Sequence, residues 1–230
     1  MQVLKAAGSG ARRLTAIESV TYNVQARLRE GSMSELADLV TARTSLDVQL
    51  QEHLALFRGL SALAEATERA ANTIVEALRT GNKIMLCGNG GSAADSQHLA
   101  AEFTGRFIKD RKPLAAVALS TDSSALTCIA NDYSFDEVFS RQLLGLGRSG
   151  DCLLAISTSG NSRNVIRAVE AAQSLNIRTI GLLGRDGGAL RSVCEQSVIV
   201  PSQTTSRIQE AHIFIGHTLC GMVESRLGLS

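Results

Sequence analysis

From Lys83 onward, short runs of consecutive apolar residues alternate with longer segments of helical periodicity. The runs are four to six residues long, a length typical of strands that are buried on both faces. The predicted strands are Ile84–Cys87, Leu114–Leu119, Cys152–Ser157, Thr179–Leu183 and Ser197–Val200. The predicted helices are Ala93–Phe107, Ser123–Ala130, Phe135–Leu146, Asn164–Leu175, Leu190–Cys194 and Ser206–Arg226. This alternation predicts an α/β fold, with a doubly wound, mainly five-stranded parallel sheet that has helices on both faces.

Residues 34–80 precede the first predicted strand and show a helical pattern throughout. Apolar residues from Leu36 through Leu39 and Val40 to Leu63 recur mostly at three- and four-residue steps. A further helix is expected from Ala64 to Leu78, before Gly81. Such an N-terminal helical extension has few partners within one subunit. We therefore expect it either to form an oligomer interface or to pack on its own domain.

Residues 1–32 differ in composition from the rest of the chain. They carry five basic residues against two acidic ones and include the small, basic stretch Ala6–Arg13. We expect a leader or a segment left by cloning, with the functional protein beginning near Met33. Residues 33–230 are then expected to form a single domain with N-terminal oligomerisation helices.

The bulk composition narrows the function classes. The net charge of +1 gives no strong field for a nucleic-acid partner. No apolar run approaches the roughly 20 residues that cross a bilayer, and no signal-peptide core is present, so a cytoplasmic protein without a membrane partner is expected. The five cysteines occur singly, without a C-x-x-C pair. This spacing favours small buried hydrophobes over a cysteine zinc site or a disulfide framework.

Two glycine- and serine-rich turns follow predicted strands and lead into predicted helices. They are Asn89-Gly-Gly-Ser92 and Ser157-Thr-Ser-Gly-Asn-Ser162. Backbone N–H groups and the helix dipole make such a turn a natural phosphate site. Gly88–Ala93 fits only a loose form of the dinucleotide fingerprint, and no acidic residue closes the second predicted strand. A phosphorylated small molecule is therefore the predicted ligand.

Candidate catalytic side chains occur on two predicted helices. His98 and Glu102 are four residues apart, about 40° around a helix axis, so they share one face. The C-terminal helix adds Gln209, Glu210, His212 and His217. Helical spacing alone favours Glu210 as the companion of His217. These residue types suit either a zinc site or metal-free acid–base chemistry, and spacing leaves both open.

Six motifs occur in order along the chain: C-G-N-G-G-S-A-A-D, Q-H-L-A-A-E-F-T-G-R-F, A-N-D-Y, A-I-S-T-S-G-N-S, G-R-D-G-G and R-I-Q-E-A-H-x-x-x-G-H. In these motifs and their order, the chain from about residue 34 to 228 resembles the sugar isomerase domain family, and within it the phosphoheptose isomerase subfamily. The H-x-x-x-E and Q-E-x-H-x-x-x-x-H spacings are the most diagnostic of the isomerases.

The resemblance implies a role for each matching position. The positions that match sugar-phosphate contacts are Ser157, Thr158, Ser159 and Ser162. Further substrate contacts match Asn89, Gly90, Gly91, Ser92, Glu102, Asn131, Asp132 and Gln209. The metal-ligand positions match His98, Glu102, Gln209 and His217, which implies one zinc ion per subunit and prefers Gln209 over Glu210. Glu102 and His217 match the catalytic base and acid.

The implied activity is isomerisation of sedoheptulose 7-phosphate to D-glycero-D-manno-heptose 7-phosphate by enediol proton transfer, in a homotetramer, for lipopolysaccharide precursor synthesis. One alternative is a non-catalytic module of the same fold that binds the replication initiator protein; the presence of Glu102 and His217 argues against it. A sugar-phosphate-sensing transcription regulator would need a helix-turn-helix, which residues 1–80 do not show. An arabinose-phosphate isomerase would carry further C-terminal domains.

Overall fold

The computed structural model describes residues 33–229. The predictions for residues 1–32 and for the side chains of Leu36 and Leu39 lie outside what it describes. The chain divides into two compact units, residues 1–52 and 53–230. The described part of the first unit belongs to helix α2 (Met33–Gly59). This part of α2 exposes several large apolar side chains, namely Val40, Leu46, Val48 and Leu50.

The second unit contains five parallel strands, which confirms the predicted fold class. The strands lie in the order β2-β1-β3-β4-β5. Their bounds are Ile84–Cys87 for β1, Ala116–Ala118 for β2, Cys152–Ser157 for β3, Arg178–Gly184 for β4 and Gln196–Val200 for β5. Neighbouring strands β1 and β3 run in register, with Cys87 opposite Ala155. The carboxyl ends of β1 and β3 therefore lie side by side.

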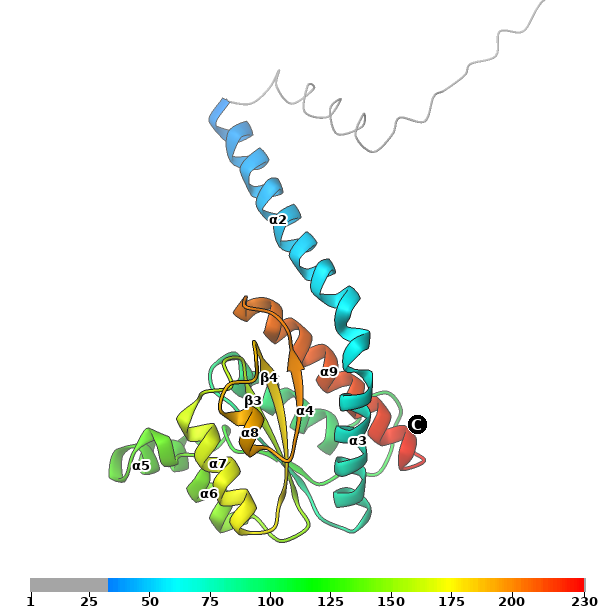
Figure 1. Ribbon diagram of the computed structural model, residues 1–230, viewed down its shortest axis with the longest axis vertical. Helices are drawn as coiled ribbons and strands as arrows, with labels where there is room; N and C mark the ends of the chain where they lie inside the picture. The colour runs from blue at the N-terminus through cyan, green and yellow to red at the C-terminus, as the bar shows by residue number, and fades with distance from the viewer. Residues whose placement is uncertain (1–32, 230) are drawn as a thin grey trace, which may run out of the picture. The chain divides into compact units, whose positions relative to one another are not determined.

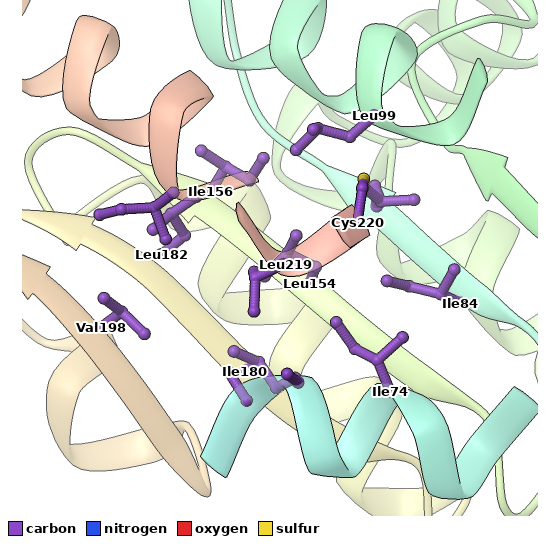
Figure 2. Packing of buried hydrophobic residues seen from close by; sticks show 14 of the residues in the cluster. Ile74, Ile84, Leu99, Leu154, Ile156, Ile180, Leu182, Val198, Leu219 and Cys220 are labelled. Atoms are coloured by element: carbon purple, nitrogen blue, oxygen red, sulfur yellow. The ribbon is translucent and has the colours of Figure 1, made fainter. Parts of the chain in front are cut away.

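Helices cover both faces of this sheet (Figure 1). The helices of the second unit include α3 (Ala64–Arg79), α4 (Gly91–Thr104), α5 (Ser123–Asp132), α6 (Ser140–Leu146), α7 (Arg163–Ser174), α8 (Leu190–Val193) and α9 (Thr205–Arg226), with the short 3-10 helices η1 (Leu60–Leu63) and η2 (Phe135–Glu137). Helices α3, α4 and α9 share one hydrophobic cluster with the sheet, and α6, α7 and α8 share the other. Figure 2 shows the first cluster, in which Leu219 of α9 lies next to Leu154 of β3 and Leu99 of α4 lies near Cys220.

The helices that follow β1 and β3 cover opposite faces. Helix α4 lies in the first cluster and α7 in the second. The gap between the carboxyl ends of β1 and β3 is therefore the switch point of the sheet, where open α/β folds bind their ligands.

The bounds of several predicted elements differ from the observed ones, and hydrogen bonds explain two of these differences. The second strand was expected over Leu114–Leu119 but spans only Ala116–Ala118, because the Leu114 N–H donates to the Phe103 carbonyl and not to a strand. The helix expected over Phe135–Leu146 is interrupted, and α6 begins at Ser140. The Ser140 hydroxyl bonds to the side chain and backbone of Glu137, and such a local bond competes with continuous helix.

Two expectations from composition can be compared with the described residues. No helix among residues 33–229 is long and apolar enough to cross a membrane. The cysteines Cys87, Cys152, Cys194 and Cys220 are buried, as expected, whereas Cys128 is exposed. Burial raises the pKa of the Cys152, Cys194 and Cys220 thiols to about 12. These three cysteines therefore remain protonated packing residues at neutral pH.

Candidate active site

The first turn joins β1 to α4, and its backbone is packed too closely for side chains at some positions. Gly90 has φ +55°, a conformation that favours glycine, and a Cβ on Gly88 would lie 2.7 Å from the Ser92 carbonyl oxygen. Helix α4 begins at Gly91, two residues before the predicted start. Gly91 and Ser92, which were expected in the connecting turn, are therefore the first two residues of the helix. Ser92 is buried with 3% exposure. Of the four residues predicted to contact substrate in this turn, Ser92 is thus the least accessible.

The second turn joins β3 to α7 and is organised by its own hydroxyl groups. The Ser157 and Ser162 hydroxyls lie 3.1 Å apart, and Ser157 Oγ also accepts the Gly160 N–H. Gly160 has φ +67°, and a Cβ there would collide with the Gly187 carbonyl. Ser157 is buried, while Thr158, Ser159 and Ser162 are partly exposed. The partly exposed hydroxyls lie at the N-terminus of a 12-residue helix, an arrangement suited to a phosphate group.

A pair of asparagines connects the two turns across the switch point. Asn89 Nδ2 donates to Asn164 Oδ1 at 2.8 Å, and Asn164 Nδ2 donates back to Asn89 Oδ1 at 2.9 Å. Asn164 is the second residue of α7 and is 3% exposed. This double hydrogen bond fixes the first turn relative to the second. It also occupies part of the carboxamide that was expected to contact substrate at Asn89.

Three of the four predicted metal ligands converge between α4 and α9. His98 and His217 approach with their Nε2 atoms 2.8 Å apart, and His98 Nε2 lies 3.4 Å from Glu102 Oε1. One ligand atom of each of the three residues lies within 4.8 Å of the others. Two imidazoles and a carboxylate are ligands that zinc accepts. The same three groups can also transfer protons.

The fourth predicted ligand, Gln209, reaches the first turn. Its side-chain amide lies against Gly91, so closely that a Cβ on Gly91 would collide with Gln209 Nε2. Glu210, the neighbour that helical spacing favoured, is engaged elsewhere. Its Oε2 lies 2.8 Å from His53 Nδ1, and its other oxygen pairs with Arg207. The arrangement therefore favours Gln209 over Glu210 as the α9 side chain beside the first turn.

Burial shifts the pKa values of two further groups on α4 and α9. It raises the pKa of Asp95 to about 6, an effect that nearby His98 partly opposes. It lowers the pKa of His212 to about 4, and the backbone of Leu183 only partly offsets that effect. Within residues 33–229, neither ring nitrogen of His212 has a hydrogen-bond partner that meets normal geometry. His212 is thus a neutral packing residue at pH 7. It is not part of the hydrogen-bonded His98–His217 pair.

The predicted substrate pair Asn131 and Asp132 lies at the end of α5, two residues beyond the predicted end of that helix. Asn131 Nδ2 donates to Asp132 Oδ1 at 2.8 Å, and the Cys128 thiol contacts Asp132 Oδ2. Both residues are exposed. These hydrogen bonds stay within α5, and none of them joins the pair to His98, Glu102 or His217.

Sequence reasoning missed two polar residues that shape the site. Asn164 was assigned only to a helix, and Asp95 only to the motif that precedes His98. A polar residue directly after the second turn could have signalled Asn164, but its partner is 75 positions earlier in the chain. The partial burial of Asp95 follows from the packing of α4 and leaves no signal in the local pattern.

Comparison with known proteins gives consistent matches. A family model described as the SIS domain matches residues 50–184. The phosphoheptose isomerase of Helicobacter hepaticus is 48% identical over 186 residues, which cover 81% of this chain and 95% of that protein. The phosphoheptose isomerase of Nitratiruptor sp. is 58% identical over 150 residues, covering 65% and 80%. The solved structure of the phosphoheptose isomerase from Neisseria gonorrhoeae matches with a TM-score of 0.77 and 46% identity, covering 80% and 99%.

Proposed function

The chain belongs to the SIS domain family and, within it, to the phosphoheptose isomerases, and from this membership we propose how its site interconverts sedoheptulose 7-phosphate and D-glycero-D-manno-heptose 7-phosphate. The observation that carries the proposal is that Glu102 of α4 and His217 of α9, which are 115 positions apart in the sequence, bring their ligand atoms within 4.8 Å of each other. A non-catalytic module of this fold would not require that pair.

The phosphate of the sugar binds the second turn. Thr158, Ser159 and Ser162 supply partly exposed hydroxyls, and the N-terminus of α7 supplies backbone dipole and N–H groups. The buried Ser157 hydroxyl is already bonded to Ser162 and Gly160. We assign Ser157 to holding the shape of the turn, while the other three hydroxyls face the phosphate.

Isomerisation moves one proton between C1 and C2 of the sugar. The Glu102 carboxylate takes the proton from C1 of the ketose, the electron pair forms the C1–C2 double bond of an enediol, and the C2 carbonyl oxygen gains a proton. Glu102 then returns a proton to C2 as the O1 hydroxyl loses its own and becomes the aldehyde oxygen. The His217 imidazole carries the proton between the oxygens, because a histidine side chain can both donate and accept a proton during catalysis.

The donor set fits a zinc ion. His98, Glu102 and His217 present ligand atoms within 4.8 Å of one another, and Gln209 contacts the first turn at Gly91. Bound zinc would polarise the sugar carbonyl and stabilise negative charge on its oxygen. Coordination by metal lowers the basicity of a carboxylate, so Glu102 must either leave the ion during proton transfer or serve an ion that mainly organises the site.

Incubation with sedoheptulose 7-phosphate in deuterium oxide, followed by NMR, tests the reaction. The wild-type protein should form aldose and introduce deuterium, and Glu102→Gln should abolish both without loss of the fold. Glu170→Gln changes an exposed ion pair of α7 and serves as the control. Turnover by Glu102→Gln at the wild-type rate would remove the proposed base. Repeating the reaction after chelation, with zinc restored, separates an essential ion from an organising one.

We further propose a cytoplasmic homotetramer whose product supplies heptose for lipopolysaccharide. An apolar groove in the second unit supports self-association, since exposed apolar patches of this kind mark interfaces. The groove is lined mainly by Phe57, Leu60, Ala64, Phe214, Ile215 and Met222. Analytical ultracentrifugation should give a tetramer for the wild type and smaller species for Phe214→Glu. A monomeric wild type at micromolar concentration would refute the tetramer.

A further inference from the structure

A buried ion pair joins the segment after α4 to the last helix. Arg111 Nε lies 2.6 Å from Glu224 Oε1, and the two side chains are 2% and 1% exposed. Neither residue belongs to the groups that hold the sugar or move protons. Burying two charges costs free energy that their attraction often fails to repay. A role beyond stability would account for their place in the fold.

The rest of the Arg111 guanidinium holds the end of α4. It donates to the Glu102 carbonyl at 2.8 Å and to the Phe103 carbonyl at 2.7 Å. These carbonyls lie in the last turn of the helix, where backbone acceptors lack partners and a positive charge is favourable. The backbone of the proposed base, Glu102, is therefore fixed directly by Arg111.

The Glu224 carboxylate links the ion pair to His217, the proposed acid, through Phe107. Its Oε1 also accepts the Phe107 N–H at 3.1 Å, and the Phe107 ring stacks on His217 with ring centroids 5.5 Å apart and planes 29° apart. Glu224 follows His217 by seven residues on α9, about two turns, so both lie on one face of that helix. Glu224 thus anchors the backbone of Phe107, the residue whose ring packs against the His217 imidazole.

We propose that Arg111 and Glu224 are positioning residues that set the geometry of Glu102 and His217 relative to each other. This inference rests on the proposed function, because it assumes that Glu102 and His217 perform the proton transfers. The ion pair is not among the groups proposed to bind the substrate or transfer protons. It acts through the Glu102 backbone on one side and the Phe107 ring on the other.

Arg111→Lys tests the contact with the Glu102 backbone, and Phe107→Leu tests the ring contact with His217. Lysine keeps the charge but cannot reproduce the several directed hydrogen bonds of the guanidinium. Leucine keeps an apolar side chain but removes the ring that packs on His217. We expect kcat to fall about tenfold or more for Arg111→Lys and severalfold for Phe107→Leu, with KM within about twofold, because residues that orient ligands and bases typically cost 10- to 100-fold. Zn²⁺ affinity, measured by competition with a chromogenic chelator, should fall in parallel.

Arg178→Lys provides the matched control, because Arg178 pairs with Glu195 at 2.6 Å on the protein surface. It should leave kcat and Zn²⁺ affinity unchanged. If Arg111→Lys does not fold, the double variant Arg111→Met/Glu224→Leu removes both charges, and its circular dichroism should be native while its kcat stays low. Folded Phe107→Leu and folded charge variants with wild-type kcat and wild-type Zn²⁺ affinity would overturn the inference.

Failure of the proposed function gives a different result. A wild-type protein that binds Zn²⁺ but does not convert the sugar phosphate would refute the isomerase reaction. The Zn²⁺ affinities of the same variants would still decide whether the ion pair positions His217 and Glu102.

Discussion

The side chains of Asn89 and Asn164 hydrogen-bond to each other in both directions, at 2.8 and 2.9 Å, although one follows β1 and the other opens α7. Each carboxamide donates once and accepts once. The two turns that face the switch point are therefore held in a fixed relation by one pair of side chains.

Replacing Asn164 should weaken substrate binding. Asn164→Ala removes both hydrogen bonds and should raise KM about tenfold with a smaller change in kcat, because the loosened turns hold the sugar phosphate less well. Asn164→Asp retains a bond from Asn89 but adds a negative charge near the phosphate, and KM should rise further. Steady-state kinetics at constant ionic strength compares them. A KM for Asn164→Asp below that of Asn164→Ala would contradict a phosphate beside this pair.

A methyl group at Gly91 should displace Gln209. Gly91→Ala places a Cβ where the Gln209 amide lies, so Zn²⁺ affinity and kcat should both fall about tenfold. Gly145→Ala, at a helical position with open space around the Cβ, should leave both unchanged and stabilise the fold by up to about 1 kcal/mol. Isothermal titration calorimetry measures the Zn²⁺ affinity of the Gly91→Ala and Gly145→Ala variants, and urea unfolding measures their stability. Unchanged Zn²⁺ affinity in Gly91→Ala would exclude Gln209 as a ligand.

The close approach of α4 and α9 depends on Gly216. A Cβ there would lie 2.6 Å from both terminal carbons of Leu99, and overpacking of this kind costs about 1–3 kcal/mol. Gly216→Ala should therefore lower the free energy of unfolding by that amount. Gly221→Ala is the matched control on the same helix, because its Cβ would meet Phe107 only at 3.4 Å. Urea unfolding should rank the wild type and Gly221→Ala above Gly216→Ala; equal midpoints for the two alanine variants would refute the tight contact.

The buried ring of His212 predicts a loss of stability in mild acid. Burial lowers its pKa from 6.5 to about 4 in the folded state. Below pH 6.5 the unfolded chain therefore binds a proton that the folded chain does not, so stability falls as the pH drops from about 6.5 toward 4. Between pH 7 and pH 5 this group should account for about 2 kcal/mol.

The variant His212→Leu isolates this effect from other titrating groups. Its free energy of urea unfolding should change less between pH 7 and pH 5 than that of the wild type. Identical slopes for His212→Leu and the wild type would show that the ring is not kept neutral by burial.

The strands and most helices could be predicted because each buries a continuous or periodic set of apolar residues. Leu153 and Leu154 face opposite clusters of the core, and that two-sided burial appears in the sequence as an uninterrupted apolar run. The start of the second strand could not be predicted, because it depends on the hydrogen bond that the Leu114 N–H donates to the Phe103 carbonyl.

Helical spacing could relate candidate site residues only where they lie on the same helix. His98 and Glu102 share α4, so their spacing was informative. The choice between Gln209 and Glu210 depends on the distant partners Gly91 and His53. Local spacing favoured Glu210 because it carries no information about those contacts, whereas the family motif pointed to Gln209, the residue that lies beside the first turn.

Helix α9 follows all five strands in the sequence, yet it carries Gln209 and His217. During synthesis on the ribosome, the sheet, both turns and α4 emerge while α9 is still unmade. At that stage the chain lacks His217, the imidazole that we propose carries the protons, and it lacks the apolar face of α9 that completes the first hydrophobic cluster. We therefore expect isomerase activity to begin only when α9 packs against the rest of the domain, and a chain released before α9 is made should be inactive.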